Sequence, residues 1–208
     1  MNIILTGAET AAGETATPQM RRSARDIIRK QVDRMNNLIN EFLEFTRGPS
    51  STTILATANY AEFVMQLIEE IRTELTGRSV VVELENEPPD VSVLVDPTRL
   101  SHVFQNLVYN ACDAMPDGGR VKLRFQQSDR RIITEIEDSG TGIAPEIAPR
   151  LFEAFATYGK AQGTGLGLSI CKTIVEDHHG AIGARSDPGR GAVLYFSLPL
   201  PGETGDKS

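Results

Sequence analysis

The sequence predicts an α+β protein, in which one mixed, mainly antiparallel sheet carries helices on one face and follows a partial helical hairpin. Two observations predict this class. Up to a Gly-Pro-Ser-Ser break at 48–51, apolar residues recur at helical spacing, whereas the rest of the chain mixes helical stretches with short runs of alternating hydrophobicity. Helices interspersed with antiparallel strands are typical of a sheet covered by helices on one side.

The composition indicates an acidic globular protein. The 208 residues include 21 Lys and Arg against 28 Asp and Glu, and 40% are hydrophobic. Nucleic acids and anionic membranes attract clustered positive charge, so we expect no nucleic-acid partner and no membrane contact by this segment. The two cysteines form no CxxC pair, which argues against zinc and disulfide scaffolds. We expect a cytoplasmic protein, and the sequence leaves open whether a longer parent protein is membrane-anchored.

Residues 1–50 are expected to form the hairpin. Apolar residues over 21–45 fall three or four positions apart, which predicts a long amphipathic helix. Residues 3–14 are expected to end another helix, with the turn at 15–18. The two helices leave an apolar stripe that a second copy of the hairpin would cover, so we expect a homodimer through this region.

Residues 51–200 are expected to form the second domain, and residues 201–208 a disordered tail. Apolar periodicity predicts helices over 64–75, 97–115, 145–155 and 166–177, the first of them ended by Gly77 at C′. Alternation predicts strands over 80–84, 91–95, 121–125, 132–136, 181–185 and 192–198.

The first motif lies on the predicted helix over 97–115. Asn106 and Asn110 are four positions apart, so their side chains share a face, and Asp113 lies a further turn along it. An amide oxygen is a neutral hard ligand that suits Mg²⁺, which takes its other ligands from water and phosphates. The alternative is a solvated helix face, the usual setting of asparagine.

The second motif, Asp138-Ser-Gly140-Thr-Gly142-Ile143, directly follows a predicted strand. Its glycines let the backbone turn tightly against a ligand. A carboxylate only accepts hydrogen bonds, so Asp138 suits the exocyclic amine of adenine and would repel the carbonyl of guanine. Taken alone, the pattern is also typical of a simple turn.

The third motif precedes the predicted helix over 166–177 and consists of Gly163, Thr164, Gly165, Leu166, Gly167 and Leu168. Backbone N–H groups at a helix N-terminus, unobstructed by side chains, form an anion site that suits phosphates. The segment is neither a Walker loop nor a dinucleotide fingerprint. Residues 151–160 between the second and third motifs resemble a mobile lid, in which Lys160 either meets a phosphate or is simply solvated.

In this order, the segments NLVYNACDAMPDGG, DSGTGI, LFEAFAT and GTGLGLSI resemble the asparagine, first glycine, phenylalanine and second glycine boxes of sensor histidine kinases. The MPDGG ending is similar to the subgroup of the nitrogen-regulation sensor. The resemblance covers about residues 53–200. It implies the Bergerat-type ATP-binding sandwich of the GHKL ATPases, with ATP and Mg²⁺ as cofactors.

The resemblance also implies a role for each motif. Asn110 would bind Mg²⁺ with Asn106 beside it, both as catalytic residues, and Asp138 would bind the adenine amine. Gyrase-like relatives carry a glutamate at the position of Asn106 that activates water, and asparagine cannot act as that base, so phosphotransfer is favoured over hydrolysis. The implied ATP site comprises Asn110, Asp113, Asp138, Gly140, Gly142, Ile143, Lys160, Gly163, Thr164, Gly165, Leu166, Gly167 and Leu168.

The hairpin resembles the dimerisation and phosphoacceptor domain of the same kinases, whose first helix carries the acceptor histidine. The three histidines here, His102, His178 and His179, all lie outside the hairpin. We therefore expect a truncated product of a longer kinase that has no phosphoacceptor and cannot autophosphorylate alone. His178 and His179 are expected to act as cations at the negative end of a helix, and His102 to pack or be solvated.

The implied function is the ATP-binding catalytic part of a two-component sensor histidine kinase. Such an enzyme donates the γ-phosphate of Mg-ATP to a histidine, for relay to an aspartate of a response regulator. One alternative is an ATPase or serine kinase of the same fold, similar to anti-sigma-factor kinases. Another is a non-catalytic dimeric module that binds response regulators. Rapid phosphate release or serine labelling would favour the first, and failure to bind ATP the second.

Overall fold

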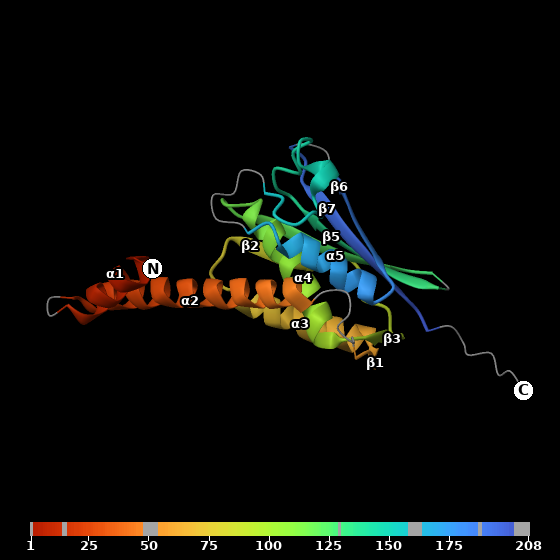
Figure 1. The fold of residues 1–208 in the computed structure, drawn as a ribbon, viewed down its shortest axis with the longest axis horizontal. Coiled ribbons are helices and arrows are strands. Elements are labelled where there is room, and N and C mark those ends of the chain that lie inside the picture. The colour runs from red at the N-terminus through yellow and green to blue at the C-terminus, as the bar shows by residue number, and fades with distance from the viewer. Residues whose placement is uncertain are drawn as a thin grey trace, which may run out of the picture. The chain divides into compact units, whose positions relative to one another are not determined.

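The structure, a computed structural model, describes residues 2–13, 16–47, 54–128, 130–157, 164–186 and 189–201. The contacts within it divide the chain into two units, Met1–Gly48 and Pro49–Ser208 (Figure 1). Of the predicted tail, all but Pro201 lies outside the described residues. Among the residues it describes, no helix has the length and apolar character needed to cross a membrane.

The first unit is a pair of helices, α1 (Asn2–Ala12) and α2 (Pro18–Arg47). The start of α2 follows from its sequence, because proline is favoured in the first turn and the Thr17 hydroxyl accepts a hydrogen bond from the N–H of Met20. The hairpin leaves a cavity of about 510 Å³, whose apolar lining includes Ile3, Met20 and Ile27. These three side chains are each about half exposed (54%, 47% and 44%).

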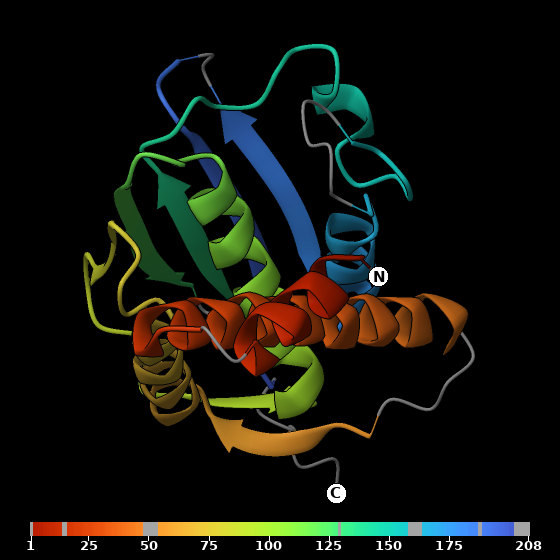
Figure 2. The same ribbon diagram turned by 90° about the vertical axis from the view of Figure 1, so that its left-hand side faces the viewer.

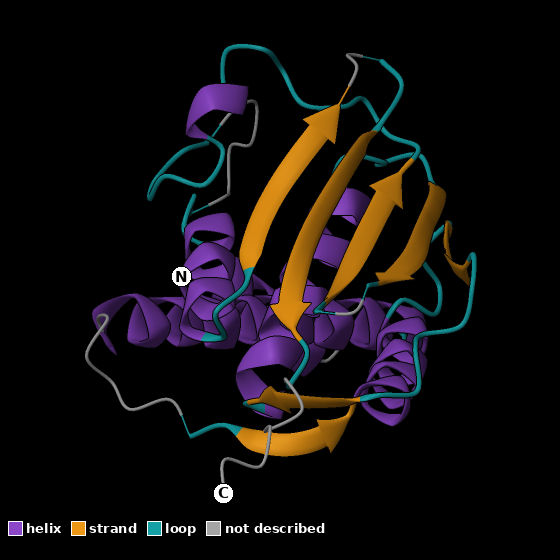
Figure 3. Ribbon diagram, turned by 90° about the vertical axis from the view of Figure 1, so that its right-hand side faces the viewer, coloured by secondary structure: helices purple, strands orange, loops and turns teal. Residues whose placement is uncertain are grey.

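The second unit contains a five-stranded sheet (Figure 3). Its spatial order is β2 (Val80–Leu84), β4 (Gly119–Gln127), β5 (Arg131–Asp138), β7 (Ala192–Pro199) and β6 (Ala181–Ser186). Only the pairing of β2 with β4 is parallel among these strands. The predicted mixed, mainly antiparallel sheet is therefore confirmed. A separate antiparallel pair joins β1 (Ala56–Asn59) to β3 (Ser92–Val95).

Three helices cover one face of this sheet: α3 (Tyr60–Glu74), α4 (Pro97–Asp113) and α5 (Gly167–Asp177) (Figure 2). Phe104 of α4 and Phe196 of β7 pack edge to face, with ring centroids 5.3 Å apart, which joins the helical layer to the sheet. Asp96 caps α4, because its Oδ1 accepts hydrogen bonds from the N–H groups of Thr98 and Arg99. This N-cap fixes where the helix of the first motif begins.

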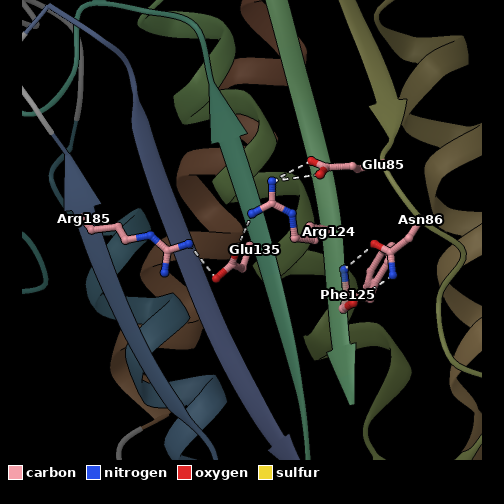
Figure 4. A network of polar contacts seen from close by, with 6 residues as sticks. All are labelled: Glu85, Asn86, Arg124, Phe125, Glu135 and Arg185. Atoms are coloured by element: carbon pink, nitrogen blue, oxygen red, sulfur yellow. Dashed lines mark hydrogen bonds and ion pairs between the residues drawn. The ribbon is translucent and has the colours of Figure 1, made fainter.

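The opposite face of the sheet carries a row of charged side chains (Figure 4). Glu135 is only 4% exposed, and it accepts hydrogen bonds from Arg185 at 2.7 Å and from Arg124 at 3.3 Å. Arg124 also pairs with Glu85 at 2.7 Å. Because side chains alternate along a strand, Glu135 lies opposite the core face that its neighbours Thr134 and Ile136 share.

Two local predictions are wrong. The predicted helix over 145–155 is limited to the single 3₁₀ turn η1 (Ala148–Arg150), since Pro149 lacks the N–H that a longer helix needs and Phe155 turns back to donate to Gly165. Gly77 is not at C′, because the C-cap of α3 is Leu75, and Gly77 follows two positions later with a φ of +92°. The strand β1 was not predicted, because Ala-Thr-Ala-Asn has no large apolar alternation.

Candidate functional site

The first motif lies on α4, as predicted. Val103, Phe104 and Leu107 are fully buried on one side of this helix, whereas Asn106 and Asn110 are half-buried beside them. Asp113, the last residue of the helix, is exposed. The apolar face of α4 thus fixes the helix to the sheet and holds both amides at its border with solvent, where their oxygens suit a hard cation such as Mg²⁺.

The second motif lies at the end of β5. The Asp138 side chain is directed into the structure and is 6% exposed, and its Oδ1 accepts a 2.8 Å hydrogen bond from the N–H of Gly140. Burial raises the pKa of the Asp138 carboxyl, and hydrogen bonds from the backbone of Gly140 and Ala192 partly offset this effect. A buried carboxyl group with accepting capacity suits the exocyclic amine of adenine.

Close packing brings the first two motifs together. A Cβ atom at Gly140 would lie 2.6 Å from the carbonyl oxygen of Ala114, the C-cap residue of α4. Only a residue without a side chain lets the Asp138 loop approach the end of α4 this closely. The C-terminal end of the asparagine helix and the aspartate loop therefore pack directly against each other.

The structure adds two supporting residues that the sequence reasoning did not assign to the site. The Ser186 hydroxyl accepts a hydrogen bond from the N–H of Ile143 at 2.9 Å and donates to the carbonyl of Gly191 at 2.7 Å. A Cβ atom at Gly191 would lie 1.9 Å from the carbonyl oxygen of Asp138. The signal that could have identified them is the Ser-Asp-Pro-Gly-Arg-Gly segment before the last strand, whose two glycines are typical of a close backbone approach.

The third motif leads into α5. Gly167 is the first helical residue, Leu166 before it is buried, and Thr164 accepts a hydrogen bond from the N–H of Leu166 at 3.3 Å. Gly165 has a φ of +70°, and a Cβ atom there would lie 2.6 Å from the backbone of Phe155. Lys160 and Gly163, which were predicted to contribute to the site, lie outside the described residues.

The packing of α4 against α5 relates the third motif to the first (Figure 2). Arg99, near the start of α4, forms an ion pair with Asp177 at the end of α5. The two helices therefore run antiparallel, and the N-terminus of α5 faces the half of α4 that carries Asn106 and Asn110. The described parts of all three motifs thus gather at one end of the helical layer.

The predicted role of His178 as a helix-terminal cation is wrong. The ring is 1% exposed, Nδ1 lies 2.7 Å from the carbonyl oxygen of Ile174, and Nε2 accepts a hydrogen bond from the N–H of Asp96. A ring nitrogen that accepts from an N–H carries no proton, so His178 is neutral. His179 is exposed with a φ of +57°, and His102 on α4 is half-buried.

Comparison with known proteins finds one matching family model. Residues 95–202 match the model described as "Histidine kinase-, DNA gyrase B-, and HSP90-like ATPase". The sensor histidine kinase ZraS of Salmonella typhimurium is 34% identical over 176 residues, which cover 84% of this chain. The chain spans only 37% of the length of that relative.

Solved structures of histidine kinases have the same fold. Full-length ShkA in complex with AMPPNP has a TM-score of 0.71 at 26% identity and matches 96% of this chain and 42% of its own. The histidine kinase ThkA in complex with the response regulator TrrA also has a TM-score of 0.71, over 96% of this chain and 57% of its own. At 24% identity, the second likeness concerns the fold alone.

Proposed function

Because this chain belongs to the family of histidine kinase-, DNA gyrase B- and HSP90-like ATPases, we propose that its second unit binds Mg-ATP and donates the γ-phosphate to a histidine. In this proposal the chain is the ATP-binding catalytic part of a two-component sensor histidine kinase. The observation that carries it is the gathering of the aspartate loop, the asparagine helix and the N-terminus of α5 at one end of the helical layer.

Each part of this arrangement has a role that its chemistry supports. The buried carboxyl of Asp138 accepts a hydrogen bond from the adenine amine, within a pocket shaped by Gly140, Gly142 and Ile143. Asn110 offers a neutral amide oxygen to Mg²⁺, with Asn106 beside it. The N–H groups at the start of α5 face the phosphates. Bound Mg²⁺ supplies neutralisation of phosphate charge, and phosphoryl transfer needs little more than such positioning.

We favour transfer over hydrolysis because the position at which gyrase-like relatives carry a glutamate is occupied here by Asn106. The amide of Asn106 cannot take a proton from water at neutral pH. The name of ZraS, a sensor histidine kinase, supports the same class of reaction. In this proposal the final acceptor is an aspartate of a response regulator, the class of protein with which ThkA, a kinase of the same fold, forms its complex.

We also propose that the hairpin forms a homodimer. Its half-exposed apolar side chains line one cavity between α1 and α2, and a second hairpin would bury this surface within a four-helix bundle. This part of the proposal is independent of nucleotide binding.

Substitution of Asp138 tests the nucleotide site. In Asp138→Asn the amide oxygen can still accept from the N–H of Gly140, but the charge that faces the adenine amine is lost. We expect the dissociation constant for Mg-ATP, measured by calorimetry at pH 7.5, to rise about 10- to 100-fold. The control Glu146→Gln removes the same charge at an exposed position that is not among the proposed site residues, and it should bind like the wild type. Equal affinities of both variants would contradict the assignment of Asp138.

Incubation with γ-labelled ATP tests the reaction itself. The protein is mixed with Mg²⁺, labelled ATP and a kinase subunit that has an acceptor histidine but lacks its own asparagine ligand. We expect acid-labile label on that subunit and little free phosphate. Rapid phosphate release, or label on serine, would instead indicate an ATPase or serine kinase of the same fold.

A further inference from the structure

A set of buried polar contacts joins the last residues of α5 to the first residues of α4. His178 follows α5 directly and is 1% exposed, and Asp177 is the last helical residue. On the other side, Asp96 caps α4, and Arg99 lies in its first turn. We call these four residues the helix latch.

The hydrogen bonds of His178 define its protonation state. The carbonyl oxygen of Ile174 can only accept, so Nδ1, at 2.7 Å from it, carries the ring proton. The N–H of Asp96 can only donate, so Nε2, at 2.9 Å from it, is bare. Both ring nitrogens are therefore satisfied in a single neutral tautomer, and a proton added at Nε2 would oppose one donor with another.

The charged groups that face His178 come from both helices. Arg99 of α4 forms an ion pair with Asp177 of α5 at 2.8 Å, and the side chains are 7% and 22% exposed. Asp96 uses its Oδ1 to cap the N–H groups of Thr98 and Arg99. Burial lowers the pKa of His178 below its usual range, and the Arg99 charge lowers it further. The hydrogen bond to the carbonyl of Ile174 and the charges of Asp96 and Asp177 partly offset this shift.

The two helices that the latch joins both carry parts of the proposed site, at their ends away from the latch. Helix α4 continues to Asn106 and Asn110, and α5 begins at Gly167, directly after the described residues 164–166 of the third motif. Because helices are stiff, a change in how their latched ends meet changes the spacing of their far ends.

We propose that His178 is a positioning residue whose neutral ring sets the spacing between α4 and α5, and that its protonation opens the latch and weakens nucleotide binding. The proposal rests on the proposed function for the identity of the ligand. The requirement that the ring stay neutral for the two helices to pack also applies to the chain without nucleotide.

The variant His178→Gln separates this role from simple packing, because a glutamine oxygen at the position of Nε2 can still accept from Asp96 but has no pKa near neutrality. The matched control is His179→Asn, which removes the neighbouring exposed histidine and suits its positive φ. The measurement is the dissociation constant for Mg-ATP from pH 8 down to the lowest pH at which the protein stays folded. The terminal phosphate of ATP also takes up a proton near pH 6. The informative quantity is therefore the dissociation constant of the wild type divided by that of the variant at each pH.

We expect the ratio of wild type to His178→Gln to remain at its pH 8 value through the usual titration range of histidine and to rise only at lower pH, where the buried ring takes up its proton, by up to about tenfold per pH unit. The ratio of wild type to His179→Asn should not change with pH. A ratio for His178→Gln that also does not change with pH would overturn the proposal.

A measurement on the wild type alone covers the case in which His178→Gln does not fold. Nitrogen NMR of the histidine rings should show His178 as the Nδ1-protonated neutral tautomer at pH 7, with the backbone amides of Asn106 and Asn110 shifting as the ring titrates. An ordinary titration near pH 6.5, or asparagine amides that do not follow the ring, would overturn the proposal. Absence of ATP binding at pH 8 would contradict the proposed function alone, because these NMR results do not depend on nucleotide.

Discussion

At the scale of single residues, Gly191 shows how closely the backbone packs around the proposed adenine pocket. Its φ of +83° is unfavourable for any residue with a side chain, and a Cβ atom there would lie 1.9 Å from the carbonyl oxygen of Asp138. The contact is with backbone, which has little room to move. The position of Asp138 therefore depends on a glycine 53 positions later in the chain.

The substitution Gly191→Ala separates this steric contact from the cost of a positive φ. Gly189 is the matched control, because its φ is +78° but a Cβ atom there meets nothing within 4 Å. We expect Gly189→Ala to lower the free energy of unfolding by about 1 kcal/mol and Gly191→Ala by about 3 kcal/mol or more. Chemical denaturation of both variants measures the difference, and equal losses would show that the contact with Asp138 relaxes freely.

The sequence made Asp138 recognisable, but it did not indicate the role of His178. Asp138 belongs to a local pattern of an apolar strand followed by alternating glycines. The chemistry of His178 depends on Asp96, 82 positions earlier, whose N–H it accepts. From the sequence alone, a histidine at the end of a helix is expected to be a cation, and only its burial against α4 excludes the charged form.

At the scale of elements, ion pairs cover the face of the sheet opposite α3, α4 and α5 (Figure 4). Glu135 of β5 lies between Arg124 of β4 and Arg185 of β6, and Arg124 continues to Glu85, just after β2. Arg185 also lies over the ring of Tyr195, 5.7 Å from its centroid. The long side chains cover the apolar surface of the strands while their charges remain paired.

Glu135, at the centre of this row, is expected to contribute more to the free energy of unfolding than a carboxylate in an exposed ion pair of the same sheet. Glu135→Gln removes a buried charge that two arginines share, and we expect it to lower the free energy of unfolding by about 1–3 kcal/mol. The control Glu83→Gln removes a carboxylate from an exposed pair with Arg120, 3.3 Å apart, and should cost less than about 1 kcal/mol. Thermal denaturation at low and high salt compares them, and a larger loss for Glu83→Gln would contradict this ranking.

The predicted elements were most accurate where the apolar period was long. Helix α4 and strands β4, β5 and β7 lie close to their predicted ranges, because their buried faces repeat over several residues. The segment 145–155 carries apolar residues at helical spacing too, but prolines at 145 and 149 and the backbone contact of Phe155 with Gly165 prevent a helix. The strand β1 depends on its pairing with β3, which its own residues do not indicate.

At the scale of the whole molecule, the two units make separate contributions to the proposed kinase. The first has an apolar cavity of about 510 Å³ between its helices, and the second has a core of its own. Nucleotide binding and dimer formation should therefore respond to different substitutions.

The substitution Ile27→Asp tests the dimer. It places a carboxylate in the lining of the hairpin cavity, where a second copy would bury it without a partner. We expect the dissociation constant of the dimer, measured by sedimentation equilibrium, to rise about tenfold or more, with the affinity for Mg-ATP unchanged. The control Arg29→Asp introduces the same group at an exposed position outside that lining. A monomeric wild-type protein would contradict the proposed dimer.

The sequence by itself determined the class of this protein. The periodicity of its apolar residues indicated a sheet with helices on one face, and the order of four short motifs indicated the family. These signals are local, because each depends on residues within one helix, strand or loop. The tertiary structure alone decided which contacts lie behind the proposed site: those of Ser186 and Gly191 near Asp138, and that of His178 with Asp96. Those contacts join segments far apart in the chain, and their geometry exists only once the elements have packed together.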